Sequence, residues 1–365
     1  MKIKNVELFL VASSRWTTGS PSRHGILRLR SEDGIEGLGE LSDLNHMPLA
    51  MQPDLGRLRE ALRGVLVGKD AFRIRALTEA AGAACGSGLW SARMKSAVDM
   101  ALHDLVGRAL GVPVYVLLGG KRRERIPVCF PIGRMRSMDE VENRLERVAK
   151  AVERGFHRIR LYCGGDWDAD EAFLSRLRDE YGSEVELKSL DLSGRLRWKD
   201  SVRFLGRMKQ YDYDMAESVG LGRDDLEGIA EVRRRADVPI SEHVADYRAG
   251  AAMVKAGAVD VFNVATYDLG IRGALSLFEL AHGAGLQALH GTTQELSIGT
   301  AAAAHVCAAA PAVDLPCDPA GPQLYVEDVV KERVQYENSE MIVPDGPGLG
   351  VELDEDKLKE LAGQA

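Results

Sequence analysis

The sequence predicts an α/β fold: a (β/α)8 barrel preceded by an N-terminal α+β domain. Its 365 residues suit one barrel of roughly 250 residues and a second domain of roughly 100. Up to about residue 112, strand-like segments are followed by helical ones; further on, short apolar strands alternate with amphipathic helices. In this second part, polar residues end successive strands about every 25 residues, the length of one strand, loop and helix.

The N-terminal α+β domain is predicted to occupy residues 1–120. Strands are expected over 2–11 and 25–41, because apolar and β-branched residues alternate there. The polar stretch 12–24 between them contains Gly and Pro and is expected to be a mobile loop. Apolar residues at i, i+3 and i+4 then predict helices within 51–112. Strands followed by helices are typical of an α+β unit.

The barrel is predicted to span residues 121–325, and residues 326–365 form a separate C-terminal segment. An open doubly wound sheet is the competing architecture, but it would need a glycine-rich first turn. The chain contains neither GxGxxG nor GxxxxGK[ST], so nucleotide binding has little support. The barrel strands are expected near 127–131, 157–162, 185–191, 212–217, 238–242, 259–265, 286–290 and 313–318.

The composition argues against several classes of protein. Lys and Arg number 47 against 55 Asp and Glu, and a net charge of −8 without a basic stripe argues against a nucleic-acid partner. No apolar run reaches the about 18 residues of a membrane span, and the N-terminus lacks the cleavage site of a signal peptide. The five cysteines are scattered without CxxC spacing, so we expect a reduced, cytoplasmic protein with no membrane partner.

Three acids end successive predicted strands: Asp191, Glu217 and Glu242. Carboxylates that converge at one barrel mouth repel each other unless a cation compensates them. Oxygen-only ligation favours Mg²⁺, with Mn²⁺ as the second choice. Taken singly, each acid could instead be a loop residue or a helix N-cap. Their occurrence in three successive units at one register favours a metal site.

Three further residues near strand ends could carry chemistry. His290 ends the seventh strand and could act as a general acid or base, although a lone strand histidine is often structural. Alternation places Arg160 and Tyr162 on the inner face of the second strand. A buried arginine needs a partner, so we expect Arg160 beside the acids or a substrate carboxylate. Tyr162 beside that guanidinium could have a lowered pKa and act as a base, or could simply pack.

A set of stretches along the chain carries a family resemblance. They read SAVDMALHDLVGRALGVPVYVLLGG (96–120), GFHRIRLY (155–162), KSLDLS (188–193), AESV (216–219), PISEHV (239–244), GAVDVFNVATYDLGIRGAL (257–275), HGTTQELSIGTAAAAHVCAA (290–309) and VPDGPGLGVELDEDKL (343–358). Together they resemble the mandelate racemase/muconate lactonizing enzyme group of the enolase superfamily. The resemblance implies that the N-terminal α+β domain is a capping domain, that the (β/α)8 barrel beneath it is of the (β/α)7β type, and that the C-terminal tail returns to the cap. It also implies a small-molecule carboxylate substrate, a homo-oligomer, and Mg²⁺-assisted removal of a proton next to the carboxylate to give an enediolate.

The resemblance also assigns roles to single residues. Asp191, Glu217 and Glu242 match the metal ligands, and His290 matches the catalytic histidine of the seventh strand. The stretch 12–24 matches a mobile specificity lid over the barrel mouth. The residues expected to contact substrate are Arg15 and His24 in this lid, His46 in a second capping-domain loop, Ser193, His243 and, on the eighth strand, Asp318.

Two departures from the family pattern narrow the reaction. The second strand usually carries Lys-x-Lys but here reads Arg160-Leu161-Tyr162, and Ala265 stands where the sixth strand usually has Asp or Lys. We therefore expect a single-base carbon–oxygen lyase that dehydrates a sugar acid or related hydroxy acid, with Tyr162 or His290 taking the α-proton. A racemase, an epimerase or a lactone cycloisomerase is the first alternative. A barrel that has lost catalysis and serves as a binding protein is the second.

Overall fold

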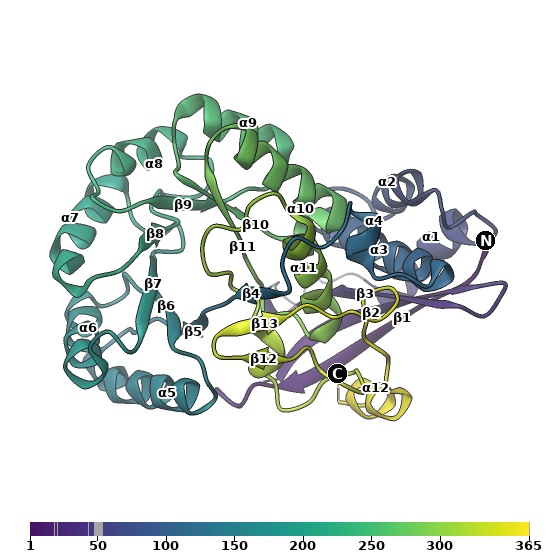
Figure 1. Ribbon diagram of the computed structural model, residues 1–365, viewed down its shortest axis with the longest axis horizontal. Helices are drawn as coiled ribbons and strands as arrows, with labels where there is room; N and C mark the ends of the chain where they lie inside the picture. The colour runs from purple at the N-terminus through teal and green to yellow at the C-terminus, as the bar shows by residue number, and fades with distance from the viewer. Residues whose placement is uncertain (18, 20, 43, 47–53, 365) are drawn as a thin grey trace.

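The N-terminal part of the chain forms a three-stranded antiparallel sheet (Figure 1). The computed structural model describes residues 1–17, 19, 21–42, 44–46 and 54–364. Strands β1 (Ile3–Ser14), β2 (Pro21–Ser31) and β3 (Glu36–Leu41) are neighbours both in sequence and in the sheet. The predicted strands are present, and the second of them is two strands joined by a tight turn.

The stretch 12–24, predicted as a mobile lid, is largely β-strand. β1 and β2 stay in register up to Ser14 opposite Pro21, so the loop shrinks to 15–20, of which residues 18 and 20 lie outside the described residues. The hairpin end is also held from its other side, because the amide of Val326 donates to the Ser14 carbonyl at 2.9 Å. Paired backbone groups stabilise an extended chain whatever its side-chain polarity, and the composition alone could not show these partners.

Helices α1 (Leu55–Leu66), α2 (Ile74–Ala84) and α3 (Leu89–Leu110) follow as predicted, and a short helix α4 (Val114–Leu117) ends this part. α3 packs against β3 at very close range. A Cβ atom added to Gly39 would lie 2.0 Å from the Ala97 carbonyl oxygen, and one on Gly37 would lie 2.2 Å from that of Ala101. Only glycine allows this approach, so β3 and α3 form the rigid half of the capping domain.

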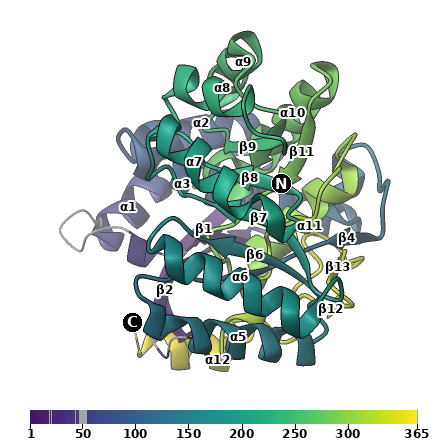
Figure 2. The same ribbon diagram turned by 90° about the vertical axis from the view of Figure 1, so that its left-hand side faces the viewer.

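The second part of the chain is a curled, parallel, seven-stranded sheet with helices on its outer face (Figures 1 and 2). Each strand of this sheet pairs with the strands that precede and follow it in the sequence, from β5 to β11. This is the arrangement expected for consecutive βα units. Among the described residues, no helix combines the length and apolarity needed to cross a membrane. The strands are β5 (Phe130–Ile132), β6 (Arg158–Tyr162), β7 (Glu186–Asp191), β8 (Met215–Glu217), β9 (Ile240–His243), β10 (Val261–Val264) and β11 (Gln287–His290).

The helices alternate with these strands as the periodicity predicts. They are α5 (Val141–Glu153), α6 (Trp167–Tyr181), α7 (Trp198–Met208), α8 (Leu226–Arg233), α9 (Tyr247–Ala256), α10 (Thr266–Gly283) and α11 (Ser297–Ala309). α10 is interrupted at Gly270, where φ is 71° and ψ is 176°. The kink separates its first residues from the rest of the helix. The positions of seven of the eight predicted barrel strands are thus confirmed by an overlapping strand.

The eighth predicted strand, near 313–318, is not a regular strand, so the assigned sheet is curled but does not close. Part of the reason is Pro316, which has no N–H to donate to a ladder. The segment still bridges the two edges of the sheet. The amide of Asp318 donates to the carbonyl of His290 at 2.8 Å, and the amide of Cys129 donates to the carbonyl of Cys317 at 2.9 Å.

The C-terminal residues contact both parts of the molecule. β12 (Tyr336–Glu337) and β13 (Glu340–Ile342) form an antiparallel sheet with β4 (Arg125–Pro127), the segment just before β5. The last helix, α12 (Glu355–Ala362), packs against β1 (Figure 1). Arg28 of β2 forms an ion pair with Glu355. The tail thus reaches the capping domain, as the family resemblance implies. The division into 1–120, 121–325 and 326–365 stays a prediction.

The glycine contacts give a stability prediction with an internal control. Gly39→Ala should lower the free energy of unfolding by roughly 1–3 kcal/mol, because the new methyl group meets a backbone oxygen that cannot move alone. Gly64→Ala, on exposed α1 with open space around its Cβ position, should instead raise it by about 0.5–1 kcal/mol. Urea denaturation measures both; equal effects would contradict the assigned close approach.

Candidate active site

A pocket of about 350 Å³ opens at the carboxyl ends of the parallel strands, the end at which barrel enzymes carry their active sites. Six of the residues predicted for the site line it: Arg160, Tyr162, Asp191, Ser193, Glu242 and His243. Others lie below or away from it: Glu217, Asp318, His290, Arg15 and His24. His46 belongs to a short 3₁₀ helix (Leu44–His46), and its side chain lies outside the described part of the chain.

Arg160 is buried in the middle of the site and connects the floor of the barrel with the pocket. Its Nη1 lies 2.9 Å from Oδ2 of Asp318 and 3.6 Å from Oε1 of Glu217. Its Nη2 donates to the hydroxyl of Tyr162, and the guanidinium lies 4.6 Å from the centroid of that ring. The arginine therefore has the acidic partners that its burial requires, and the nearer one is Asp318.

A second buried cation, Lys188, enters the site through a β-bulge. β6 and β7 pair Ile159 with Leu187 but Arg160 with Ser189, so Lys188 is an extra residue in β7. The extra residue changes the alternation of inward and outward side chains along the strand. Sequence reasoning missed Lys188 because regular alternation does not reveal a bulge.

The carboxylate of Asp318 forms ion pairs with both of these cations. Its Oδ1 accepts from Nζ of Lys188 at 2.7 Å and from the thiol of Cys129 at 3.1 Å, while Oδ2 faces Arg160. The side chains of Asp318, Lys188 and Arg160 are at most 2% exposed. Its carboxylate is paired with internal cations and does not line the pocket, and the predicted substrate contact of Asp318 stays a prediction.

Glu217 is held by donors from three different strands. Its Oε1 lies 3.1 Å from Nε2 of His243 and accepts from Nδ2 of Asn263 at 3.0 Å, in addition to facing Arg160. Burial alone would raise its pKa, but Arg160 and His243 outweigh burial and hold the pKa of Glu217 well below its usual range. Sequence reasoning missed Asn263, whose signal was a lone polar residue inside an apolar strand.

Asp191 is the register partner of Glu217 on the neighbouring strand. Its Oδ1 accepts from the amide of Ser193 at 2.7 Å and from its hydroxyl at 3.0 Å. That hydroxyl also accepts from Arg134 at 2.8 Å. Burial and the charge of Glu217 raise the pKa of Asp191. Ser193 thus fixes the orientation of this carboxylate at the pocket wall.

Glu242 completes the predicted acid set but faces a different neighbour. Its Oε1 accepts from the Ser218 hydroxyl at 3.0 Å and from the His243 amide at 2.9 Å. Burial raises its pKa. Within the described ranges, no three or more His, Cys, Asp or Glu side chains gather into a group that could hold a metal ion. The assignment of Asp191, Glu217 and Glu242 as metal ligands stays a prediction.

The charges and free oxygens of the site nevertheless fit a divalent cation. Oε2 of Glu217 and Oε2 of Glu242 are buried without a hydrogen-bond partner among the described atoms. Such carboxylate oxygens are the hard donors that Mg²⁺ prefers. When all are ionised, the site's buried carboxylates exceed its buried Lys and Arg side chains by two charges; these groups are Asp191, Glu217, Glu242 and Asp318 against Arg160 and Lys188.

The hydroxyl of Tyr162 lines the pocket, but its pKa is raised, not lowered as predicted. Burial is the largest influence and outweighs the opposing effect of Arg160, and the carboxylates of Asp191 and Glu217 add to the increase. Tyr162 therefore keeps its proton near neutral pH. In this structure it is a hydrogen-bond donor to the pocket rather than a ready base.

His290, predicted as a catalytic acid or base, is buried away from the pocket. The Thr266 amide donates to its Nε2 at 3.1 Å, and its Nδ1 donates to the Gly291 carbonyl at 2.6 Å. An amide can only donate and a carbonyl can only accept, so these bonds fix one neutral tautomer. Burial lowers the pKa of His290 to about 4. Its geometry supports a structural role between β10 and β11, and the catalytic role lacks an exposed nitrogen.

The lid residues predicted to contact substrate, His24 and Arg15, are not among the residues that line the pocket. Nδ1 of His24 lies 2.9 Å from Oε1 of Glu40, and its Nε2 lies 3.1 Å from the Tyr325 hydroxyl. Arg15 donates to the same hydroxyl at 3.2 Å. Both side chains connect the β1–β2 hairpin to the C-terminal part of the chain through Tyr325.

Sequence reasoning missed seven residues of the pocket wall: Gly194, Ser218, Gly222, Arg223, Tyr267, Thr292 and Thr293. All follow a strand end by a few residues, which was the available signal. Six of them stand on the segments after β7, β8 and β11, and Tyr267 stands at the start of α10. No regular pattern predicts how far such residues fold back toward the pocket.

Sequence models of known families match both parts of the chain. The model described as "Mandelate racemase / muconate lactonizing enzyme, N-terminal domain" matches residues 9–119, and that described as "Enolase C-terminal domain-like" matches residues 143–357. The chain belongs to the mandelate racemase/muconate lactonizing enzyme group of the enolase superfamily. The resemblance predicted from the sequence is thereby confirmed.

Relatives within this group are isomerases by name. Muconate cycloisomerase 1 of Rhodococcus opacus is 31% identical over 270 residues, which are 73% of this chain and 71% of that protein. The N-succinyl-L-Arg/Lys racemase of Bacillus cereus is 26% identical over 343 residues, 92% and 89% of the two chains. The crystal structure of 2-chloromuconate cycloisomerase from Rhodococcus opacus 1CP shares the fold, with a TM-score of 0.87, 24% identity and 99% of each chain covered.

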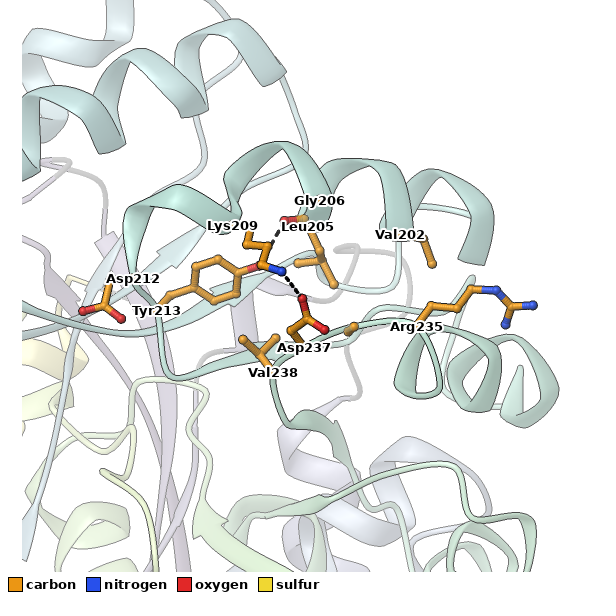
Figure 3. Close-up of a pocket in the computed structure, with 10 residues that line it drawn as sticks. Val202, Leu205, Gly206, Lys209, Asp212, Tyr213, Arg235, Asp237 and Val238 are labelled. Carbon is orange, nitrogen blue, oxygen red and sulfur yellow. Dashed lines mark hydrogen bonds and ion pairs between the residues drawn. The ribbon is translucent and has the colours of Figure 1, made fainter.

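This member of the mandelate racemase/muconate lactonizing enzyme group has another pocket at the opposite end of the strands (Figure 3). Its volume is about 320 Å³, and it lies between the end of α7 and the starts of β8 and β9. Tyr213 and Val238 form its apolar wall, and Lys209 and Asp237 form an ion pair across it (Figure 3). The amino ends of barrel strands serve stability rather than catalysis, so we place the active site at the other end.

The buried charges of this family member give a direct prediction. Lys188→Met should destabilise the protein by roughly 3–5 kcal/mol, because Asp318 loses a fully buried counter-ion. Lys331→Met, which removes a solvent-exposed pair with Glu352, should cause no measurable change. Guanidinium denaturation at neutral pH compares the two. Similar small effects would mean that Asp318 is not charged in the folded protein.

Proposed function

We propose that this protein is an isomerase that abstracts the proton next to the carboxylate of a small acid. The observation that carries the proposal is the pocket in which a buried arginine, Arg160, faces the proton-carrying side chains Tyr162 and His243 beside the acids Asp191 and Glu242. Relatives named as cycloisomerases and as a racemase support isomerisation over the dehydration first expected. Dehydration remains an outcome of the test below.

Arg160 is the group that we assign to the substrate carboxylate. Its Nη1 is engaged by Asp318 and Glu217, so its position is fixed before substrate binds. A fixed cation in a dry site stabilises the negative charge that develops on the carboxylate when the neighbouring C–H bond breaks. Because Lys is absent at the positions that usually carry it, the arginine takes over this electrostatic role.

The proton inventory of the step balances without an external reagent. The C–H bond next to the carboxylate breaks, its electron pair moves into the carboxylate, and the proton passes to His243; after Tyr162 has donated its own proton, exchange with solvent restores both side chains. Return of a proton to the same carbon from another side, or to a different carbon, gives an isomer of unchanged mass. Tyr162, which keeps its proton, is the donor that we assign to the second half of this cycle.

We also propose that Asp191, Glu217 and Glu242 hold a divalent cation, Mg²⁺ or Mn²⁺, when one is bound. Such an ion would add Lewis-acid stabilisation of the carboxylate. The two unpartnered carboxylate oxygens and the excess of negative charge support this assignment.

We infer further that the curled sheet and its bridging segment form the barrel of the group, and that the protein is a homo-oligomer acting on a small carboxylate.

Cation binding can be measured without knowing the substrate. Calorimetry on chelator-treated protein should show Mg²⁺ binding, and Asp191→Asn should weaken it by at least about 10-fold. Asp237→Asn, which removes an exposed acid at the opposite end of the barrel, should leave it unchanged. Absence of binding to the unmodified protein would remove the metal from the proposal and leave the electrostatics to Arg160.

Isotope exchange tests the reaction itself. In D₂O, nuclear magnetic resonance and mass spectrometry on a panel of small carboxylic acids should show deuterium entering next to the carboxylate, in products of otherwise unchanged composition. Arg160→Lys should lower kcat/KM by about 100-fold or more, because the smaller ammonium cannot keep the same contacts. Arg158→Lys, two residues earlier on β6 and paired with Glu186, should have little effect.

Two other outcomes of the exchange experiment would contradict the isomerase and favour a different function. A product that has lost water would select the dehydratase. Acids that raise the melting temperature but never exchange would select a binding protein.

A further inference from the structure

Arg93 of helix α3 is a buried contact point between the capping domain and the wall of the pocket. The residue is 6% exposed. Its Nε lies 2.6 Å from Oδ1 of Asp268, its Nη1 donates to the carbonyl of Ser42 at 3.0 Å, and its guanidinium lies 4.5 Å from the centroid of the Tyr267 ring. One side chain of the capping domain thus touches a capping-domain loop and two residues at the start of α10.

Two of these contacts lead directly into the pocket. Tyr267 lines it, and so does Thr293, whose hydroxyl lies 2.9 Å from the hydroxyl of Ser42. Tyr267 follows β10 and Thr293 follows β11, whereas Arg160 and Tyr162 stand on β6. The wall that Arg93 touches therefore lies across the pocket from the group assigned to the substrate carboxylate.

The start of α10 needs this support because it is separated from the rest of its helix. The kink at Gly270 interrupts the helix just after Asp268, and the amide of Ile271, beyond the kink, donates to Oδ2 of Asp99 on α3 at 2.6 Å. α3 and α10 lie side by side (Figure 1). The first residues of α10 are thus anchored through side chains of α3, and Arg93 is the one whose contacts reach Tyr267.

We propose that Arg93 is a positioning residue that sets the distal wall of the pocket, and through it the selectivity for the part of the substrate remote from the carboxylate. The claim about substrate selectivity (the selectivity half) rests on the proposed function, whereas the claim that Arg93 positions the pocket wall (the positioning half) does not. The physical reason is that a buried guanidinium with an acid, a carbonyl and a ring as partners has one favourable placement. Removing it releases Tyr267 and Ser42 together, and Ser42 in turn contacts Thr293.

A purely adhesive role between the two parts of the chain is the competing explanation. Arg108 provides the matched control, because it is an arginine of the same helix that also joins distant segments. Its Nε lies 2.9 Å from Asp104 and its Nη2 donates to the carbonyl of Val351 at 2.6 Å, away from the pocket. An adhesive role predicts similar consequences for both arginines, whereas a positioning role predicts a pocket effect for Arg93 alone.

Hydrogen–deuterium exchange of the full-length protein tests the positioning half without any substrate. Arg93→Met should accelerate amide exchange by about 10-fold or more in peptides covering 264–272 and 290–296, because the loss of its contacts with Asp268, Tyr267 and Ser42 makes local opening of this wall easier. Arg108→Met should not change these peptides. Unchanged exchange in Arg93→Met would overturn the proposal. If that variant does not fold, Arg93→Lys, which keeps the charge but not the reach, takes its place.

Kinetics test the selectivity half. Between two reacting acids that differ only at the end remote from the carboxylate, the ratio of kcat/KM should change by about 10-fold or more in Arg93→Met and mainly through KM. Arg108→Met should keep the ratio. An equal loss for both acids would overturn the selectivity role. If no acid reacts with the unmodified protein, the proposed function fails, and the exchange of the wall peptides still decides the positioning role.

Discussion

A buried network of opposite charges is the constraint on which the rest of this structure depends. Arg160, Lys188, Asp318 and Glu217 lie together out of water, and each needs the others because an unpaired buried charge is costly. The network requires the bulge in β7, which brings Lys188 inward. It also requires the segment with Asp318 to lie between the sheet edges although Pro316 prevents a regular strand. The same contacts that bridge the curled sheet therefore fix the arginine that faces the pocket.

Buried carboxylates also connect the capping domain to the second part of the chain. Glu40 of β3 accepts from the amides of Leu296 and Gly299 at 2.8 Å, at the N-terminus of α11, and also contacts His24. Asp328 accepts from the amide of Ser297 at 3.0 Å. A helix N-terminus favours negative charge, so acids from two distant parts of the chain meet there. The hairpin expected to be a free lid is consequently held in place, and the residues just before α11 form the pocket wall.

The sequence predicted the parts of the site that follow from strand periodicity. Asp191 and Glu217 are register partners because both end strands of consecutive βα units. His290 and Asp318 also stand near predicted strand ends, but they do not line the pocket. Their environment depends on residues that are far away in the chain. His290 is the register partner of Val264, and the next residue, Gly291, leaves no room for a Cβ beside Asn263. Such packing fixes which way a ring faces, and no spacing along the chain records it.

The amino-acid sequence by itself determined the fold class, the family, the order of strands and helices, and the clustering of acids at one end of the sheet. These follow from local periodicity and from chain order, which act through neighbouring residues. Only the tertiary structure decided which cation pairs with which acid, which histidine faces the pocket, and whether the stretch 12–24 is free. Those outcomes depend on burial, which removes water as a hydrogen-bond partner. Each buried charged or polar group must then be paired with one of the few groups that the fold brings within reach.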